Sequence, residues 1–122
     1  MAAPPLSPQI ATALADSGAD ASSHHLEAGA ETCFCGYFDR DLEPVLEVES
    51  GDIVDIEAVT HHSGDAPDLL MDDGIKAIWA GIDARSREPG VHIMTGPIAV
   101  QGAEPGDTLL VRILDMAPRM PY

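Results

Sequence analysis

Positive charge and aromatic rings are scarce in this sequence. Six Lys and Arg residues stand against 21 Asp and Glu, which gives a formal net charge of −15 over 122 residues. A chain this negative repels phosphate backbones and anionic headgroups, so we expect neither nucleic acid nor a membrane as a partner. Aromatic residues make up only 4%, so the core must be built mainly from Val, Ile, Leu and Ala.

Long apolar runs and a cysteine framework are also missing. No run approaches the roughly 20 apolar residues of a membrane helix. The first basic residue is Arg40, so we expect no signal peptide with a charged start. Two cysteines are too few for a disulfide framework. Together these absences favour a cytoplasmic protein.

The hydrophobic content is 45%, which excludes a disordered acidic tail and suits one domain with a modest core. Residues 1–30 are rich in Ala, Ser and Pro and are interpreted as an N-terminal extension. His24 and His25 lie within it, and we expect them to form a solvated loop pair. Residues 31–122 are interpreted as the β-rich domain.

Short apolar runs broken by Gly, Pro and Asp predict a mainly β fold, a sandwich or barrel-like domain with a short helical insertion. Strands are expected around 46–48, 54–58 and 91–100, the last interrupted by Thr95-Gly96-Pro97. The insertion includes a helix that Asp73 is expected to cap and Gly81 to end. Its apolar positions have helical spacing, and Trp79 is expected to anchor it to the sheet: they are Ile75, Ile78, Trp79 and Ile82.

A turn pattern occurs twice. Glu49-Ser50-Gly51-Asp52 and Glu104-Pro105-Gly106-Asp107 each precede an apolar run. Gly followed by Asp is typical of a tight turn, so we expect the same turn and a following strand in both places. In the second run Leu109, Val111 and Ile113 would face one way and Leu110, Leu114 and Met116 the other, which predicts a strand covered on both sides over 109–116.

Between the two turns lies a polar constellation that suits metal chemistry. Imidazole nitrogens and carboxylate oxygens are the usual ligands of a catalytic zinc or similar divalent ion, and a nearby carboxylate can move protons. The candidate metal ligands are His61, His62 and His92, and the candidate catalytic carboxylates are Asp65 and Asp68, with Asp72 and Asp73 close by in sequence.

Other interpretations of this constellation remain open. Adjacent histidines on an extended strand point to opposite faces, so His61 and His62 are not expected to share one ion. The H-H-x-x-D spacing matches no established zinc signature, and the aspartates can simply cap helices. The calcium-binding EF-hand pattern is absent.

Nucleophile motifs are few. Cys33-Phe34-Cys35 puts two thiols on one face of a strand, and we interpret them as buried free thiols because a disulfide across one residue is strained. The chain has no G-x-S-x-G elbow and no P-loop. No Cys-His-Met ligand run follows the second turn, which disfavours a cupredoxin-like electron carrier.

Several segments together resemble the acetamidase/formamidase family. They are Gly36-Tyr37-Phe38-Asp39, Leu42-Glu43-Pro44-Val45-Leu46, Val48-Glu49-Ser50-Gly51-Asp52, and the long block from Thr95-Gly96-Pro97 through Gln101-Gly102-Ala103-Glu104-Pro105-Gly106-Asp107 to Ile113-Leu114-Asp115. The resemblance spans about residues 32–122. Within these segments Asp39 is interpreted as a turn former, and Gly96, Gly102, Gly106 and Asp107 as determinants of the fold.

The resemblance implies a metal-dependent, oligomeric amidase that hydrolyses short amides such as formamide or acetamide to a carboxylate and ammonia. Relatives are several-fold longer, and they often carry His-Trp where this chain has Phe34-Cys35. The expected fold is therefore incomplete without the rest of the family's chain, and a companion polypeptide or self-association is expected to complete it. The alternative is a non-catalytic β-module or a truncated fragment with a binding or assembly role. On either interpretation, exposed apolar strand faces should favour association.

Overall fold

The computed structural model describes residues 21–36, 38–59, 72–82 and 92–118, together with Pro8 and Thr12. The described chain is mainly β, as the sequence predicts. Its elements in order are β1 (Ser23–Leu26), β2 (Cys33–Cys35), β3 (Leu46–Val48), β4 (Ile53–Ile56), α2 (Asp73–Gly81), β5 (Ile93–Thr95) and β6 (Ile98–Val100).

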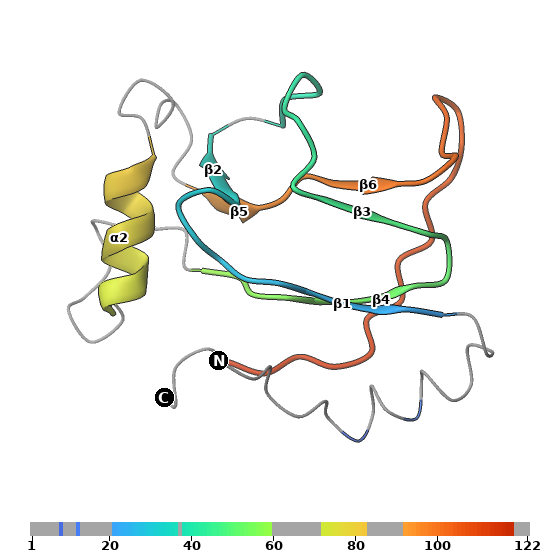
Figure 1. Ribbon diagram of the computed structural model, residues 1–122, viewed down its shortest axis with the longest axis horizontal. Coiled ribbons are helices and arrows are strands. Elements are labelled where there is room, and N and C mark those ends of the chain that lie inside the picture. Colours follow the sequence, from blue (N-terminus) through green and yellow to red (C-terminus); the bar gives the residue numbers. More distant parts are fainter. Residues whose placement is uncertain are drawn as a thin grey trace.

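The six strands form three two-stranded sheets, and within the described residues they do not close into a barrel. β1 and β4 are parallel, β3 and β6 are parallel, and β2 and β5 are antiparallel. In Figure 1 the β1/β4 pair and the β3/β6 pair lie one above the other, with β2/β5 and α2 towards one end. The expected interruption of the 91–100 strand is confirmed, because β5 and β6 are separated by Gly96 and Pro97.

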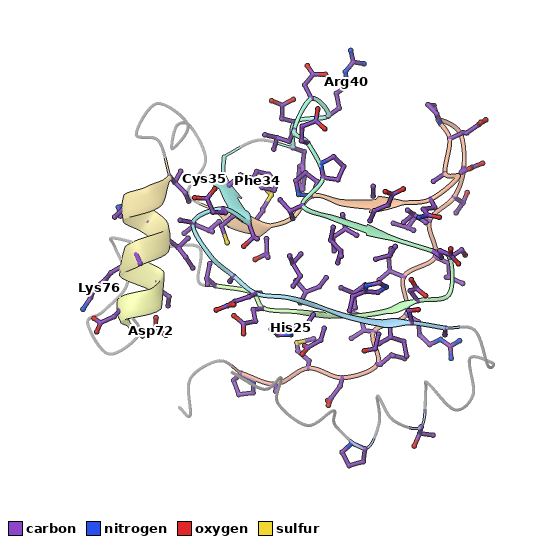
Figure 2. The ribbon with its side chains drawn as sticks, viewed as in Figure 1. His25, Phe34, Cys35, Arg40, Asp72 and Lys76 are labelled. Atoms are coloured by element: carbon purple, nitrogen blue, oxygen red, sulfur yellow. The ribbon has the colours of Figure 1, made fainter. Side chains whose placement is uncertain are left out.

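Helix α2 begins one residue earlier than the sequence pattern suggested. The capping residue is Asp72 rather than Asp73: its carboxylate accepts a hydrogen bond from the Ile75 N–H at 2.8 Å. Figure 2 shows Asp72 at the start of the helix. Asp73 instead occupies the first turn, where its negative charge favours the helix dipole. Among the described residues, no helix has the length and apolar character needed to cross a bilayer.

The core forms where α2 meets the β2/β5 sheet. Ile75 and Ile78 are the most deeply buried side chains, at 1% and 2% exposure. Trp79 is partly buried and packs against the core cluster, as expected of a residue that anchors α2 to the sheet. Ile75 and Ile78 are buried more deeply than Trp79. The buried cluster comprises Ala28, Cys33, Cys35, Ile78, Ile82 and Ile93.

Gly81 is the last residue of α2, as expected. Glycine is required at this position because the helix closely approaches Ala30. A Cβ on Gly81 would lie 2.5 Å from the Cβ of Ala30, well inside van der Waals contact. The last turn of the helix therefore lies directly against Ala30. Only glycine leaves room for this contact.

The two predicted turns are the same structure. The Asp52 N–H donates to the Glu49 carbonyl at 3.2 Å, and the Glu49 N–H donates to the Asp52 carboxylate at 3.0 Å. In the second turn Asp107 and Glu104 exchange the same two bonds at 3.1 and 2.9 Å. The third residue is glycine in both, with φ of 101° and 107°. Such positive φ values are typical of the third position of a type II turn.

The duplicated turn predicts a stabilising substitution, Ser50→Pro. Proline fits the second position of a type II turn, and Pro105 already occupies it in the second copy. Proline there restricts the unfolded chain, so the free energy of unfolding should rise by about 0.4–1 kcal/mol. Urea denaturation of the variant and of the unmodified chain measures this. A loss of stability would show that the two turns are not equivalent.

The expected strand over 109–116 is absent, and this part of the prediction is wrong. Residues 108–118 form no regular secondary structure, and Figure 1 shows them as an orange-to-red trace without an arrow. Instead of being covered on both sides, the segment exposes its apolar side chains. The exposed fractions are 71% for Leu109, 90% for Leu110, 71% for Val111, 73% for Ile113 and 81% for Met116. The separate expectation that apolar faces would be exposed in this chain is confirmed by these side chains.

Candidate functional site

Most of the predicted site residues lie outside the described part of the chain. His61, His62, Asp65 and Asp68 all fall in the undescribed stretch before α2. His92 is described: it is exposed and immediately precedes β5, and its carbonyl accepts a hydrogen bond from the Gly36 N–H at 3.4 Å. The structure therefore does not test whether His92 approaches the other four residues.

Within the described ranges, no three His, Cys, Asp or Glu side chains are arranged to hold a metal ion. Asp72, which neighbours the predicted constellation, caps α2. The alternative that these aspartates cap helices is therefore confirmed for Asp72. Any metal site built from the predicted ligands depends on the stretch that includes His61 and His62.

The structure instead brings together titratable side chains along the parallel pair β1/β4. His24 and His25 are not a loop pair, as the sequence had suggested, because they lie in β1 opposite Val54 and Asp55. Adjacent residues of a strand point to opposite faces, so the two imidazoles meet different carboxylates. Nε2 of His24 lies 2.8 Å from a carboxylate oxygen of Asp52.

His25 faces two carboxylates. Its Nδ1 lies 3.0 Å from Asp55 and its Nε2 lies 3.6 Å from Glu57. In the view of Figure 2, His25 lies below β1 and β4, on the side away from β3 and β6. An imidazole held by a carboxylate is the usual arrangement of a general base. Here, however, the distance from Nε2 to Glu57 exceeds that of a hydrogen bond.

Asp52 connects the first turn to β1. Its carboxylate accepts hydrogen bonds from the Glu49 N–H at 3.0 Å, the Ser22 N–H at 2.9 Å and His24. These bonds favour the ionised form, so the pKa of Asp52 is lowered from its ordinary value of 3.8. The Glu49 N–H has the largest effect, followed by the Ser22 N–H and His24. The hydrogen bonds of Asp52 to Ser22 and His24 therefore help to align β1 beside β4.

The acidic half of this cluster has a local pattern in the sequence, whereas the histidine half has none. Asp55 in β4 and Glu57 directly after it alternate with apolar residues, so they project from one face and can meet side chains of a neighbouring strand. The neighbour, β1, is only four residues long and follows an Ala- and Ser-rich stretch. Nothing in so short a segment distinguishes a strand from a loop.

An open apolar hollow of about 450 Å³ lies against the β2/β5 sheet and is lined by residues of both strands. Thr95 supplies a hydroxyl there, and this hydroxyl already donates to the Glu57 carbonyl at 2.7 Å. The hollow suits an apolar group, because its lining includes no ionisable side chain. The lining residues are Phe34, Phe38, Ile56, Ala58, Ile93, Met94, Thr95 and Pro97.

The Phe34-Cys35 pair is divided between the two faces of β2, as labelled in Figure 2. Phe34 lines the hollow, whereas Cys35 is buried at 6% exposure. Both cysteines are buried thiols outside any disulfide, which confirms the interpretation from the sequence. The Sγ of Cys33 lies 3.7 Å from the hydroxyl of Thr95. An aromatic ring therefore stands where the resemblance implies a histidine in many relatives.

Comparison with known proteins identifies the family. Residues 22–121 match the Acetamidase/Formamidase family, and because this is most of the chain, the chain belongs to that family. An acetamidase from Mycolicibacterium smegmatis is 63% identical over 27 residues. Those residues make up 22% of this chain but only 7% of that acetamidase, so the match spans a small part of the curated relative. The family match over residues 22–121 includes β1.

Proposed function

We propose that this chain is part of an amidase that hydrolyses short amides such as formamide or acetamide to a carboxylate and ammonia. The observation that carries the proposal is the family match over residues 22–121. The 63% identical segment of an acetamidase supports the same reaction class. A fold alone does not assign chemistry, so the proposal depends on this membership.

The proposed site combines residues of this chain with residues of a companion polypeptide or a further copy. His61, His62 and His92 are the proposed metal ligands, and Asp65 and Asp68 are proposed to move protons to and from the reacting groups. A bound divalent ion, for which zinc is our proposal, would polarise the amide carbonyl. The chain itself supplies nitrogen and carboxylate donors of the type that zinc prefers.

A non-catalytic assembly module is the second candidate. The observation that favours it is the exposed apolar segment over 108–118, which suits contact with another polypeptide better than contact with a small polar amide. This candidate predicts that the protein binds a partner but contributes no metal ligand or proton-transfer group.

Native mass spectrometry of the protein purified from its own host, with metal analysis of the same sample, is the first test. A second polypeptide together with a divalent metal supports an amidase assembly and is followed by measurement of ammonia release from formamide and acetamide. A metal-free single chain without ammonia release contradicts the amidase proposal. A metal-free complex without ammonia release supports the assembly module.

The metal ligands are tested by His62→Ala in that same assembly. We expect loss of bound metal and at least about a tenfold fall in ammonia release, since even indirect changes at metal sites have effects of this size. The matched control is His25→Ala, because His25 lies outside the proposed ligand set. Unchanged metal content and activity in His62→Ala would remove His62 from the site.

A further inference from the structure

The most unusual surface of the described chain is the segment Thr108–Leu114, which follows the second of the two equivalent turns. In the first copy the residues after the turn form β4, which pairs in parallel with β1 over four register positions, from Ser23↔Ile53 to Leu26↔Ile56. In the second copy the residues after the turn are equally rich in Val, Ile, Leu and Thr. Such residues fit a pleated, buried strand.

Among the described residues, the backbone of Thr108–Leu114 makes no hydrogen bond. Leu109, Val111 and Ile113 form a wholly apolar set of alternate side chains, whereas the other set places Arg112 between Leu110 and Leu114. The apolar set would require cover in a folded sheet. The segment is therefore extended chain with the composition of a strand but with an unpaired backbone. An unpaired apolar strand of this kind is a template for pairing with another chain.

We propose that Thr108–Leu114 is a docking strand that pairs with a strand from the part of an acetamidase/formamidase polypeptide that this chain does not match. This inference rests on the proposed function, because it takes the companion to be the remainder of an amidase.

The length of the relative supports this occupant. The same 27 residues are 22% of this chain and 7% of the Mycolicibacterium smegmatis acetamidase, so that acetamidase is longer by roughly threefold. Such a relative therefore contains ample polypeptide outside the region equivalent to this chain, and it can supply the missing strand.

Charge argues against a second copy as the occupant. Each copy carries a formal charge of −15, with 21 acidic and 6 basic residues. Repulsion between two such copies opposes their association through an apolar segment that is flanked by Glu104, Asp107 and Asp115. A companion strand with a less acidic surround escapes this repulsion.

The test uses the whole chain co-expressed with the part of the Mycolicibacterium smegmatis acetamidase that lies outside the region equivalent to residues 22–121. We expect a stable complex in which the amide hydrogens of residues 108–114 exchange at least about a hundredfold more slowly than in the isolated chain. The amides of β4 provide an internal reference, since they are already paired.

The variant Leu110→Lys combined with Val111→Lys should weaken the complex by at least about a hundredfold, because it places charge on both faces of the strand. Both side chains are exposed, at 90% and 71%, so the isolated chain should fold as before. The matched control is Phe38→Lys, which replaces an equally exposed apolar side chain outside the segment. Phe38→Lys should leave binding unchanged.

Three results would overturn the proposal: no complex, a complex in which residues 108–114 still exchange freely, or equal weakening by Phe38→Lys. A homodimer that the double lysine variant dissociates would identify a second copy as the occupant and would also overturn it. Ammonia release is measured on the same complex. Slowed exchange without hydrolysis leaves the docking strand intact and contradicts the amidase function, whereas hydrolysis that the lysine variant does not affect contradicts the docking strand.

Discussion

Replacing Ile78 with alanine should lower the free energy of unfolding by about 2–5 kcal/mol. Ile78 is 2% exposed and belongs to the buried cluster where α2 meets β2 and β5. Truncation removes apolar contacts and leaves a cavity that the short strands around it can fill only partly. Because whole domains are stable by only about 5–15 kcal/mol, this is a large fraction of the total.

The control is the same chemical change at an exposed position. Ile113 is 73% exposed in the 108–118 segment, so Ile113→Ala should change the free energy of unfolding by no more than about 0.5 kcal/mol. Urea denaturation of both variants, followed by circular dichroism, gives the comparison. Equal losses in the two variants would mean that α2 does not pack on the sheet as the structure shows.

Replacing Asp52 with asparagine should destabilise the protein at neutral pH, and the difference from the unmodified chain should shrink in acid. Asp52 accepts hydrogen bonds from two backbone N–H groups and His24, and its pKa in the folded chain is lowered from 3.8. A carboxyl whose pKa is lowered by folding contributes stability above its unfolded pKa. That contribution is lost as the pH falls below 3.8 and through the folded pKa.

Asp107→Asn is the matched control for Asp52→Asn. Asp107 makes the same contact within its own turn, where it accepts from the Glu104 N–H at 2.9 Å, but among the described residues its carboxylate contacts no other strand. Its replacement should therefore cost less. Thermal unfolding between pH 3 and pH 7 measures both variants. A constant difference between Asp52→Asn and the unmodified chain over this range would contradict the charged form as the source of stability.

Local patterns were sufficient for several elements. The turns at 49–52 and 104–107 follow from Gly at a position that requires positive φ and from Asp at the following position. The interruption at Gly96 and Pro97 and the helical spacing of Ile75 and Ile78 also appear as predicted. Asp39 is confirmed as a turn former, since its carboxylate accepts the Asp41 N–H at 2.9 Å. These features depend on residues within a few positions of each other.

The candidate site was less accessible from the sequence. His61, His62, Asp65 and Asp68 lie outside the described residues and stay a prediction. The paired histidines of β1 were missed, because the partners of His24 and His25 lie 28 and 30 residues further along the chain. Pairing over such a separation leaves no local signature.

The sequence by itself determined the mainly β composition, the duplicated turn, the buried thiols and the family resemblance. Each of these depends on residue type or on short spacing. The tertiary structure alone decided that β1 pairs with β4, that Ile75 and Ile78 lie deepest in the packing of α2, and that 108–118 stays extended. The physical reason is that an apolar segment forms a strand only where a neighbouring strand satisfies its backbone hydrogen bonds. In the described chain β4 has that neighbour and Thr108–Leu114 does not.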